Sequence, residues 1–161
     1  MKWLREHFEK YQQLRPWSFC WRISLEGTAM SLLIAGLLFP FAEERAITNL
    51  DIGAAFVILV LVAPVLETLL LQGLPVYVAR KCRATAKTQI IAATAVFSAL
   101  HFPEGFAAGM SAGLVGGFYF AFTYVHWRRT GRWVAYWTTM VSHAIHNGIA
   151  FVLLAIFGAW T

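Results

Sequence analysis

The sequence predicts an all-α protein, a polytopic transmembrane helical bundle of about five spans with an amphipathic helix at its N-terminus. Composition and hydropathy carry this prediction. Of the 161 residues, 59% are hydrophobic and 13% are charged, whereas a soluble domain has about 25% charged residues. The apolar residues are gathered into long runs, and short basic clusters separate these runs. We therefore expect an integral membrane protein.

Residues 1–22 are predicted to form a cytoplasmic amphipathic interfacial segment, and residues 23–161 a single transmembrane domain. Within residues 3–14, apolar and aromatic side chains recur at spacings of three and four residues, with charged residues between them. A helix with this pattern lies flat in the membrane interface. We expect it to anchor the N-terminus at the lipid headgroups, and binding of a specific partner is the alternative.

Five apolar runs follow this segment. A membrane crossing needs about 20 residues, so each run predicts one span, although the third run is short and the last is long. The runs cover residues 23–42, 52–79, 88–102, 106–127 and 133–160.

The basic residues predict the orientation in the membrane. Twelve of the 13 Lys and Arg residues lie in alternate segments between the runs. The positive-inside rule then places the N-terminus and the loops at 80–87 and 128–132 in the cytoplasm and the C-terminus outside. We expect this membrane to be a prokaryotic inner membrane.

Cys20 and Cys82 flank apolar runs on the cytoplasmic side, so we expect two free thiols. The basic residues do not gather on one soluble face, so we expect no nucleic-acid partner.

Four polar residues of three spans are predicted to share one depth. At about 1.5 Å per residue, Glu67, His101, His143 and Asn147 lie roughly 15–22 Å from the basic ends of their helices. His143 and Asn147 are four residues apart and therefore share one helical face. Each of them alone is more typical of interhelical packing. Ionisable residues that cluster at one depth in a membrane instead indicate a cavity, an ion path or a reaction.

This set of side chains is suited to hydrolysis. A carboxylate beside an imidazole in a pocket of low polarity can take a proton from water and act as a general base. A neighbouring His and Asn supply hydrogen-bond donors for the oxyanion of a tetrahedral intermediate. The sequence therefore predicts peptide hydrolysis without a covalent nucleophile.

Three short motifs in order resemble the CPBP family of intramembrane glutamic proteases, which includes the Rce1-type CAAX prenyl endopeptidases and bacterial Abi-type proteins. The family pattern is EExxxR on one helix, FxxxH on the next and HxxxN or HxxxD on a later one. The matching stretches here are "ETLLLQ" at 67–72, "FSALH" at 97–101 and "HAIHN" at 143–147. The resemblance implies an intramembrane protease with no cofactor and no metal.

The resemblance also implies a role for each residue. Glu67 is expected to activate water, and His101 to assist it. His143 and Asn147 are expected to hold the oxyanion, and Phe97 to pack one turn below His101.

Two positions depart from the family pattern. Thr68 stands where the family has a second glutamate, and Gln72 stands where it has an arginine. Because the two residues are four apart, we expect a neutral hydrogen bond between them in place of an ion pair.

The expected partners are the lipid bilayer and a membrane-anchored substrate, which could carry a lipid or a C-terminal sorting tail, and we expect a monomer. Two alternatives stay open. Glu and His are also ligands of catalytic zinc, so a metal-dependent hydrolase is one alternative, although the chain lacks HExxH. A scaffold, an immunity-like protein or a proton-coupled transporter is the other.

Small and charged residues give three further expectations. Pro64 and Pro75 bracket Glu67 and predict kinks in the second span. Glu26 is predicted to reach the interface or to pair with Arg22, four residues away. Glycines at every fourth position predict close packing of the fourth span against a neighbour. These glycines are Gly105, Gly109, Gly113 and Gly117.

Overall fold

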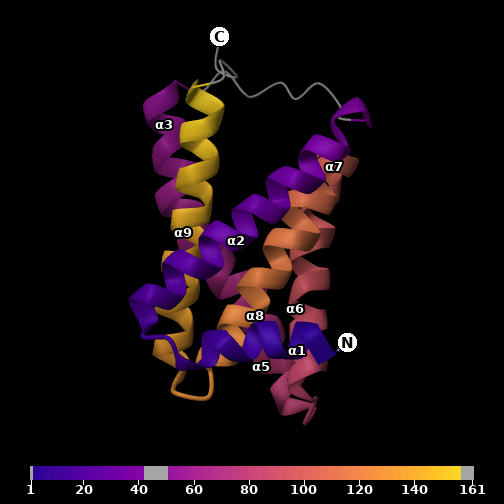
Figure 1. Ribbon diagram of the computed structural model, residues 1–161, viewed down its shortest axis with the longest axis vertical. Helices are drawn as coiled ribbons and strands as arrows, with labels where there is room; N and C mark the ends of the chain where they lie inside the picture. Colours follow the sequence, from indigo (N-terminus) through magenta and orange to yellow (C-terminus); the bar gives the residue numbers. More distant parts are fainter. Residues whose placement is uncertain (1, 42–50, 157–161) are drawn as a thin grey trace.

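The structure is a computed structural model that describes residues 2–41 and 51–156. Within these residues every regular element is helical and no strand occurs, so the predicted all-α bundle is confirmed. The longer helices run between the two ends of the molecule, and α1 lies across one end (Figure 1).

The N-terminal amphipathic segment forms α1 (Lys2–Glu9) and a short 3₁₀ turn, η1 (Lys10–Gln13). Its aromatic side chains pack on helix α8 (Gly117–Trp127). The ring centroid of Phe8 lies 4.6 Å from that of Phe122 and 5.6 Å from that of Phe118. The segment therefore shares a hydrophobic core with the bundle, and its position in the membrane interface stays a prediction.

Helix α2 (Pro16–Leu37) follows, and a 3₁₀ turn, η2 (Phe39–Phe41), comes after it. The helix begins before the apolar run that predicts it, because the fixed φ of Pro16 suits the first turn of a helix. It crosses the front of the bundle diagonally in Figure 1 and packs against α9 (Arg132–Ile156).

The expected pairing of Glu26 with Arg22 is wrong, because in the described part of the chain no ion pair joins the two. The Glu26 carboxylate instead accepts hydrogen bonds from Tyr119 at 2.7 Å and from Tyr11 at 2.5 Å. The Nε2 atom of His7 lies 2.9 Å from each of the two Glu26 carboxylate oxygens. Donors from α1, η1 and α8 surround Glu26, and the sequence spacing within α2 could not indicate them.

One continuous helix extends from Ile52 to Lys81. The Asp51 side chain caps it by accepting hydrogen bonds from the N–H groups of Gly53 and Ala54. The helix alternates between α-helical and wider π-helical stretches. These are α3 (Ile52–Phe56), η3 (Val57–Val62), α4 (Ala63–Glu67), η4 (Thr68–Gly73) and α5 (Leu74–Lys81), of which η3 and η4 are π-helical.

The two prolines explain where the π-helical stretches end. The N–H of Ala63 bonds to the carbonyl of Ile58, five residues back. The next bond of this kind would join the N–H of Pro64 to the carbonyl of Leu59, but proline has no N–H. The second π-helical stretch likewise ends just before Pro75. The helix is thus locally widened before each proline, which is common at functional sites, and the predicted kinks stay a prediction.

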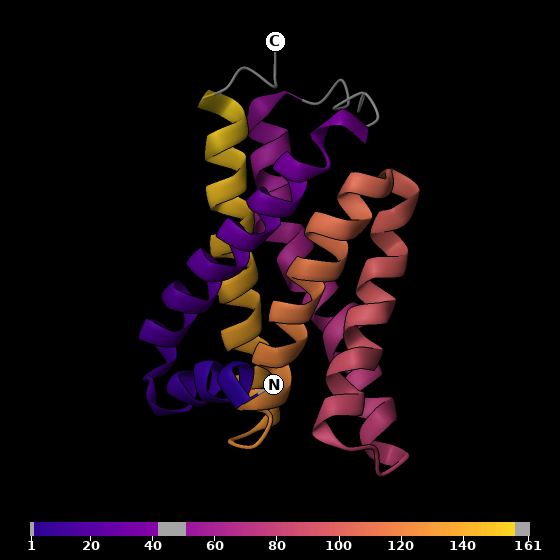
Figure 2. The ribbon, with the colours of Figure 1, turned by 45° about the vertical axis from the view of Figure 1, so that its right-hand side comes forward.

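Helix α6 (Ala86–His101) follows Thr85, whose side chain caps its N-terminus, and leads into the 3₁₀ turn η5 (Phe102–Glu104). The chain turns back at Gly105, which has a φ of 114° that favours glycine. It then forms α7 (Phe106–Ala108), the π-helical η6 (Gly109–Gly116) and α8 as one helix. Figure 2 shows this helix and α6 side by side.

Two of the four glycines, Gly113 and Gly117, pack against α6 as predicted, whereas Gly109 faces the Phe102 ring of η5 and Gly105 forms the turn. A Cβ atom at Gly113 would lie 3.0 Å from Cβ of His101, and one at Gly117 would lie 3.0 Å from the Phe97 ring. Close approach of the two helices therefore depends on these glycines, and the contacts involve two residues of the second motif.

Three of the five predicted spans form helices long and apolar enough to cross a membrane: Ile52–Lys81, Phe106–Trp127 and Arg132–Ile156. The chain is thus an integral membrane protein. The other two predicted spans are α2, which carries Arg22 and Glu26, and α6, which has 16 residues. A full crossing by these two helices stays a prediction.

Candidate functional site

Glu67 and His143 form the centre of the candidate site. Glu67 ends α4, which packs against α9, the helix that carries His143. The Nε2 atom of His143 lies 3.7 Å from Oε2 of Glu67. Only 2% of the His143 side chain is exposed, compared with 29% of the Glu67 side chain. The side chains of Glu67 and His143, which are predicted to lie at one depth, therefore approach each other, and the Glu67 carboxylate stays accessible from outside the protein.

His101 approaches Glu67 from α6. Its Nδ1 atom lies 2.9 Å from the carbonyl oxygen of Phe97, and the two rings stack with centroids 4.4 Å apart. Because a carbonyl only accepts hydrogen bonds, Nδ1 carries the proton, and Nε2 of the neutral ring is an acceptor. In the described residues His101 forms no ion pair with Glu67, but it interacts electrostatically with that carboxylate.

Phe120 of α8 is a site residue that the sequence analysis missed. Its ring stacks on His143 with centroids 4.1 Å apart and meets the edge of Phe97 at 5.6 Å. Phe97 also lies 5.7 Å from the His143 ring. These aromatic contacts hold the imidazole in one orientation. Phe120 is one of 13 phenylalanines, and no polar motif marks it, so the sequence carried no signal for it.

Asn147 has a definite partner on the backbone. Its Nδ2 atom donates to the carbonyl of Leu59 at 2.8 Å. This is the carbonyl that the missing N–H of Pro64 would have bonded in the π-helical stretch. The side-chain amide has a second hydrogen that it can donate elsewhere. Asn147 therefore joins α9 to η3 and keeps one donor for another acceptor.

The expected hydrogen bond between Thr68 and Gln72 is absent, which corrects that prediction. Both side chains are fully buried, with 0% exposure. Among the described residues neither Oγ1 of Thr68 nor either polar atom of the Gln72 amide has a hydrogen-bonding partner. The two residues lie in the π-helical η4, whose wider turn alters the α-helical geometry on which that prediction rests.

His146 faces away from Glu67, in agreement with its position on the helix. Its Nδ1 atom lies 3.1 Å from Oγ1 of Thr28 in α2. Its ring meets Phe120 edge-on at 5.3 Å. His146 therefore packs α9 against α2 and α8, and the two histidines of the third motif share Phe120 as a neighbour but differ in their polar partners.

Glu104 is a further charged residue near Glu67. Glu104 in η5 is exposed and interacts electrostatically with Glu67. Within residues 2–41 and 51–156, no three His, Cys, Asp or Glu side chains gather in a way that could hold a metal ion. The arrangement offers proton acceptors in Glu67 and His101 and hydrogen-bond donors in His143 and Asn147.

Comparison with known proteins matches most of the chain to a protein family. Residues 49–149 match the model of the Rce1-like family, described as type II CAAX prenyl endopeptidase Rce1-like. This stretch is well over half of the chain and contains all three motifs. No curated protein and no solved structure matches the chain.

Proposed function

Since the chain belongs to the Rce1-like family of type II CAAX prenyl endopeptidases, we propose that it hydrolyses a peptide bond near the membrane boundary of a membrane-anchored or lipidated protein. The family is one of CAAX-type intramembrane proteases, which act on substrates embedded in the bilayer. The observation that carries the proposal is the 3.7 Å approach of Glu67 and His143. A carboxylate at this depth is costly unless it has partners or a reaction to perform.

In the proposed reaction Glu67 is the general base. It takes one proton from a water molecule, while the acceptor Nε2 of His101 orients the second hydrogen. The water oxygen forms a bond to the carbonyl carbon of the substrate, and the π electrons of the carbonyl move to its oxygen. The electron pair on the oxyanion then re-forms the C=O bond, the C–N bond breaks with its electrons on nitrogen, and the departing amine takes the proton back from Glu67. General acid–base catalysis of this kind contributes about 10²–10⁴-fold.

The oxyanion is proposed to receive hydrogen bonds from His143 and Asn147. Nε2 of a neutral His143 faces the carboxylate and can carry the proton that it donates. Asn147 has one amide hydrogen on the Leu59 carbonyl and can donate the other. Removal of one oxyanion donor typically slows an enzyme by about 10²–10³-fold. Contacts of this kind often tighten only when substrate binds, so 3.7 Å is compatible with this role.

The test is release of a membrane tail in cells. The protein is co-expressed with candidate C-terminally anchored proteins, and tail release is followed by immunoblot for the wild type, Glu67→Gln and His101→Ala, each with and without a chelator. We expect release by the wild type that survives the chelator, and none by Glu67→Gln at equal protein level. Glu104→Gln is the matched control, since it removes a nearby exposed carboxylate and should retain cleavage.

Other outcomes would overturn the proposal. Release that stops with the chelator and returns with added metal would indicate the metal-dependent hydrolase. Failure of the wild type to release any tail, across a panel of anchored and lipidated substrates, would favour a binding or immunity protein.

A further inference from the structure

A groove of about 1100 Å³ lies away from the candidate site, between α1, α2, α6 and the helix formed by η6 and α8. Its lining contains neither Glu67, His101, His143 nor Asn147. Most of its walls are apolar. They include Phe8, Met30, Ile90, Ile91, Leu114 and Phe118.

The groove is open on its side. The side chains of Met30, Ile91 and Leu114 are 40%, 56% and 42% exposed, although all three lie in apolar stretches of the bundle. Helices α2 and α6 are two of the predicted spans, and an apolar groove between spans can take a hydrocarbon chain from the bilayer.

One polar atom in the groove wall has no partner. Thr94 is 8% exposed and lines the groove, and its Oγ1 has no hydrogen-bonding partner among the described residues. Thr123, on the neighbouring helix, shows the usual alternative, because its hydroxyl donates to the carbonyl of Tyr119 at 2.8 Å. A buried hydroxyl without a partner is costly, so Thr94 leaves an unpaired polar group beneath the surface of the groove.

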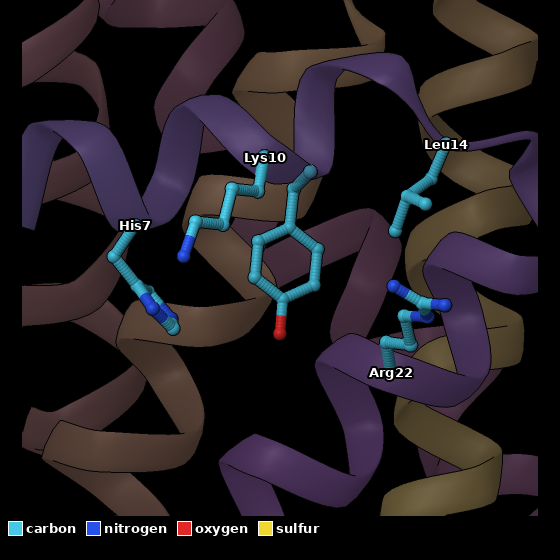
Figure 3. A pocket seen from close by; sticks show the side chains of 5 residues that line it. His7, Lys10, Leu14 and Arg22 are labelled. Carbon is cyan, nitrogen blue, oxygen red and sulfur yellow. The ribbon is translucent and has the colours of Figure 1, made fainter.

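A smaller, basic cavity of about 210 Å³ adjoins the groove and shares His7 with it. Figure 3 shows the side chains of His7, Lys10 and Arg22 around the same space, and Tyr11 also lines this cavity. In the described part of the chain, neither Lys10 nor Arg22 forms an ion pair. Lys87 lines the groove itself. Cationic groups therefore gather at one end of an apolar groove.

The nearby Glu26 carboxylate is occupied by donors of the protein. Tyr119, Tyr11 and His7 surround its oxygens. Burial and the contact with Glu26 raise the pKa of Tyr11, so its hydroxyl stays protonated and continues to donate. The basic cavity is therefore able to bind an anion despite this carboxylate.

We propose that the groove and the basic cavity together bind one anionic phospholipid, with an acyl chain between α2 and α6 and the phosphate at Lys10 and Arg22. Charge complementarity selects this occupant, because clusters of Lys and Arg at the membrane surface attract anionic lipids. The site is independent of peptide hydrolysis, so its existence does not depend on the function proposed above.

The test is native mass spectrometry of the purified, full-length protein released from detergent. The probes are phosphatidylglycerol and phosphatidylcholine with identical acyl chains. We expect the wild type to retain phosphatidylglycerol in preference to phosphatidylcholine. The double variant Lys10→Gln/Arg22→Gln should lose about 25-fold in affinity for phosphatidylglycerol, since each basic side chain contributes roughly fivefold. Its matched control, Arg129→Gln/Arg132→Gln, removes the same charge from exposed positions elsewhere and should bind as the wild type does.

A further variant tests the groove. Ala95→Trp places an indole in the groove wall and should lower retention of both lipids, while size-exclusion chromatography shows that it folds. The proposal is overturned if the wild type binds both lipids equally, or if the Lys10/Arg22 variant binds phosphatidylglycerol as tightly as its control does. It is also overturned if the wild type retains geranylgeraniol but no phospholipid, because the groove would then hold an isoprenoid chain.

Discussion

Gln72 is buried without a hydrogen-bonding partner among the described residues, whereas Gln89 is buried with one. The Nε2 atom of Gln89 donates to the carbonyl of Ala84 at 2.8 Å, and only its Oε1 lacks a partner. A buried polar group without a partner costs about 1–3 kcal/mol. The two glutamines should therefore respond in opposite directions to the same substitution.

We predict that Gln72→Met raises the free energy of unfolding by about 1 kcal/mol, because methionine has a similar size and no unpaired polar atoms. Gln89→Met should lower it by about 1 kcal/mol, because it loses the bond to Ala84. Unfolding of both variants in detergent measures the difference. Equal losses in the two variants would show that Gln72 has a partner of comparable strength, such as a substrate group or an ordered water.

At the scale of helices, the site depends on how α9 is joined to the proline-interrupted helix. The Asn147 amide takes the place of the N–H that Pro64 lacks and bonds to the carbonyl of Leu59. An interhelical hydrogen bond of this kind in a membrane protein contributes about 0.6–2 kcal/mol. Because the Asn147 side chain replaces the backbone donor that Pro64 lacks, the effects on stability of mutating Asn147 and of mutating Pro64 should depend on each other.

We predict that Asn147→Leu lowers the free energy of unfolding by about 1 kcal/mol in the wild type and by less in the Pro64→Ala background. In that background the new N–H at position 64 can bond to the Leu59 carbonyl itself. A double-mutant cycle from unfolding measurements gives the coupling. The same loss in both backgrounds would show that the amide does not replace the proline N–H.

The contact between α6 and η6 gives a second prediction for helices. A Cβ at Gly113 would lie 3.0 Å from Cβ of His101 and 3.1 Å from Cα of Ser98. Gly113→Ala should therefore push α6 aside, lower stability by about 1–3 kcal/mol and displace His101 from Glu67. Gly36→Ala is the control, since nothing lies within 4 Å of its Cβ position, and it should gain about 0.5–1 kcal/mol. If Gly113→Ala and Gly36→Ala were equally stable and cleaved the substrate equally well, Gly113 would not be needed for the close approach of α6 and η6.

At the scale of the whole molecule, the predicted orientation can be read from a native cysteine. Cys82 is an exposed free thiol between α5 and α6, whereas Cys20 is buried. We predict that a membrane-impermeant maleimide labels Cys82 in inverted membrane vesicles and not in intact cells. In a Cys82→Ser background, Glu104→Cys should show the opposite pattern. Labelling of Cys82 in intact cells would show that the orientation in the membrane is opposite to the one that the basic loops predict.

The sequence predicted the parts of this molecule that depend on composition and helical spacing. Long apolar runs predicted the bundle, and counting along the helices from their basic ends placed Glu67 and His143 at one level, where they meet. Other features depend on contacts between distant segments. The bonds of Glu26 to α1, η1 and α8 and the stacking of Phe120 on His143 are of this kind. The π-helical stretches were also missed, because proline predicts a perturbation but not its form.

The central claim is that Glu67 activates water, and the rate of peptide cleavage by purified protein tests it most directly. Wild type, Glu67→Gln and Glu67→Ala are compared in detergent or vesicles at equal amounts of folded protein, with a substrate identified by tail release. We predict a rate at least about 10²-fold lower in both variants, with partial recovery of Glu67→Ala when formate supplies a carboxylate. Cleavage by Glu67→Gln at the wild-type rate would contradict the account.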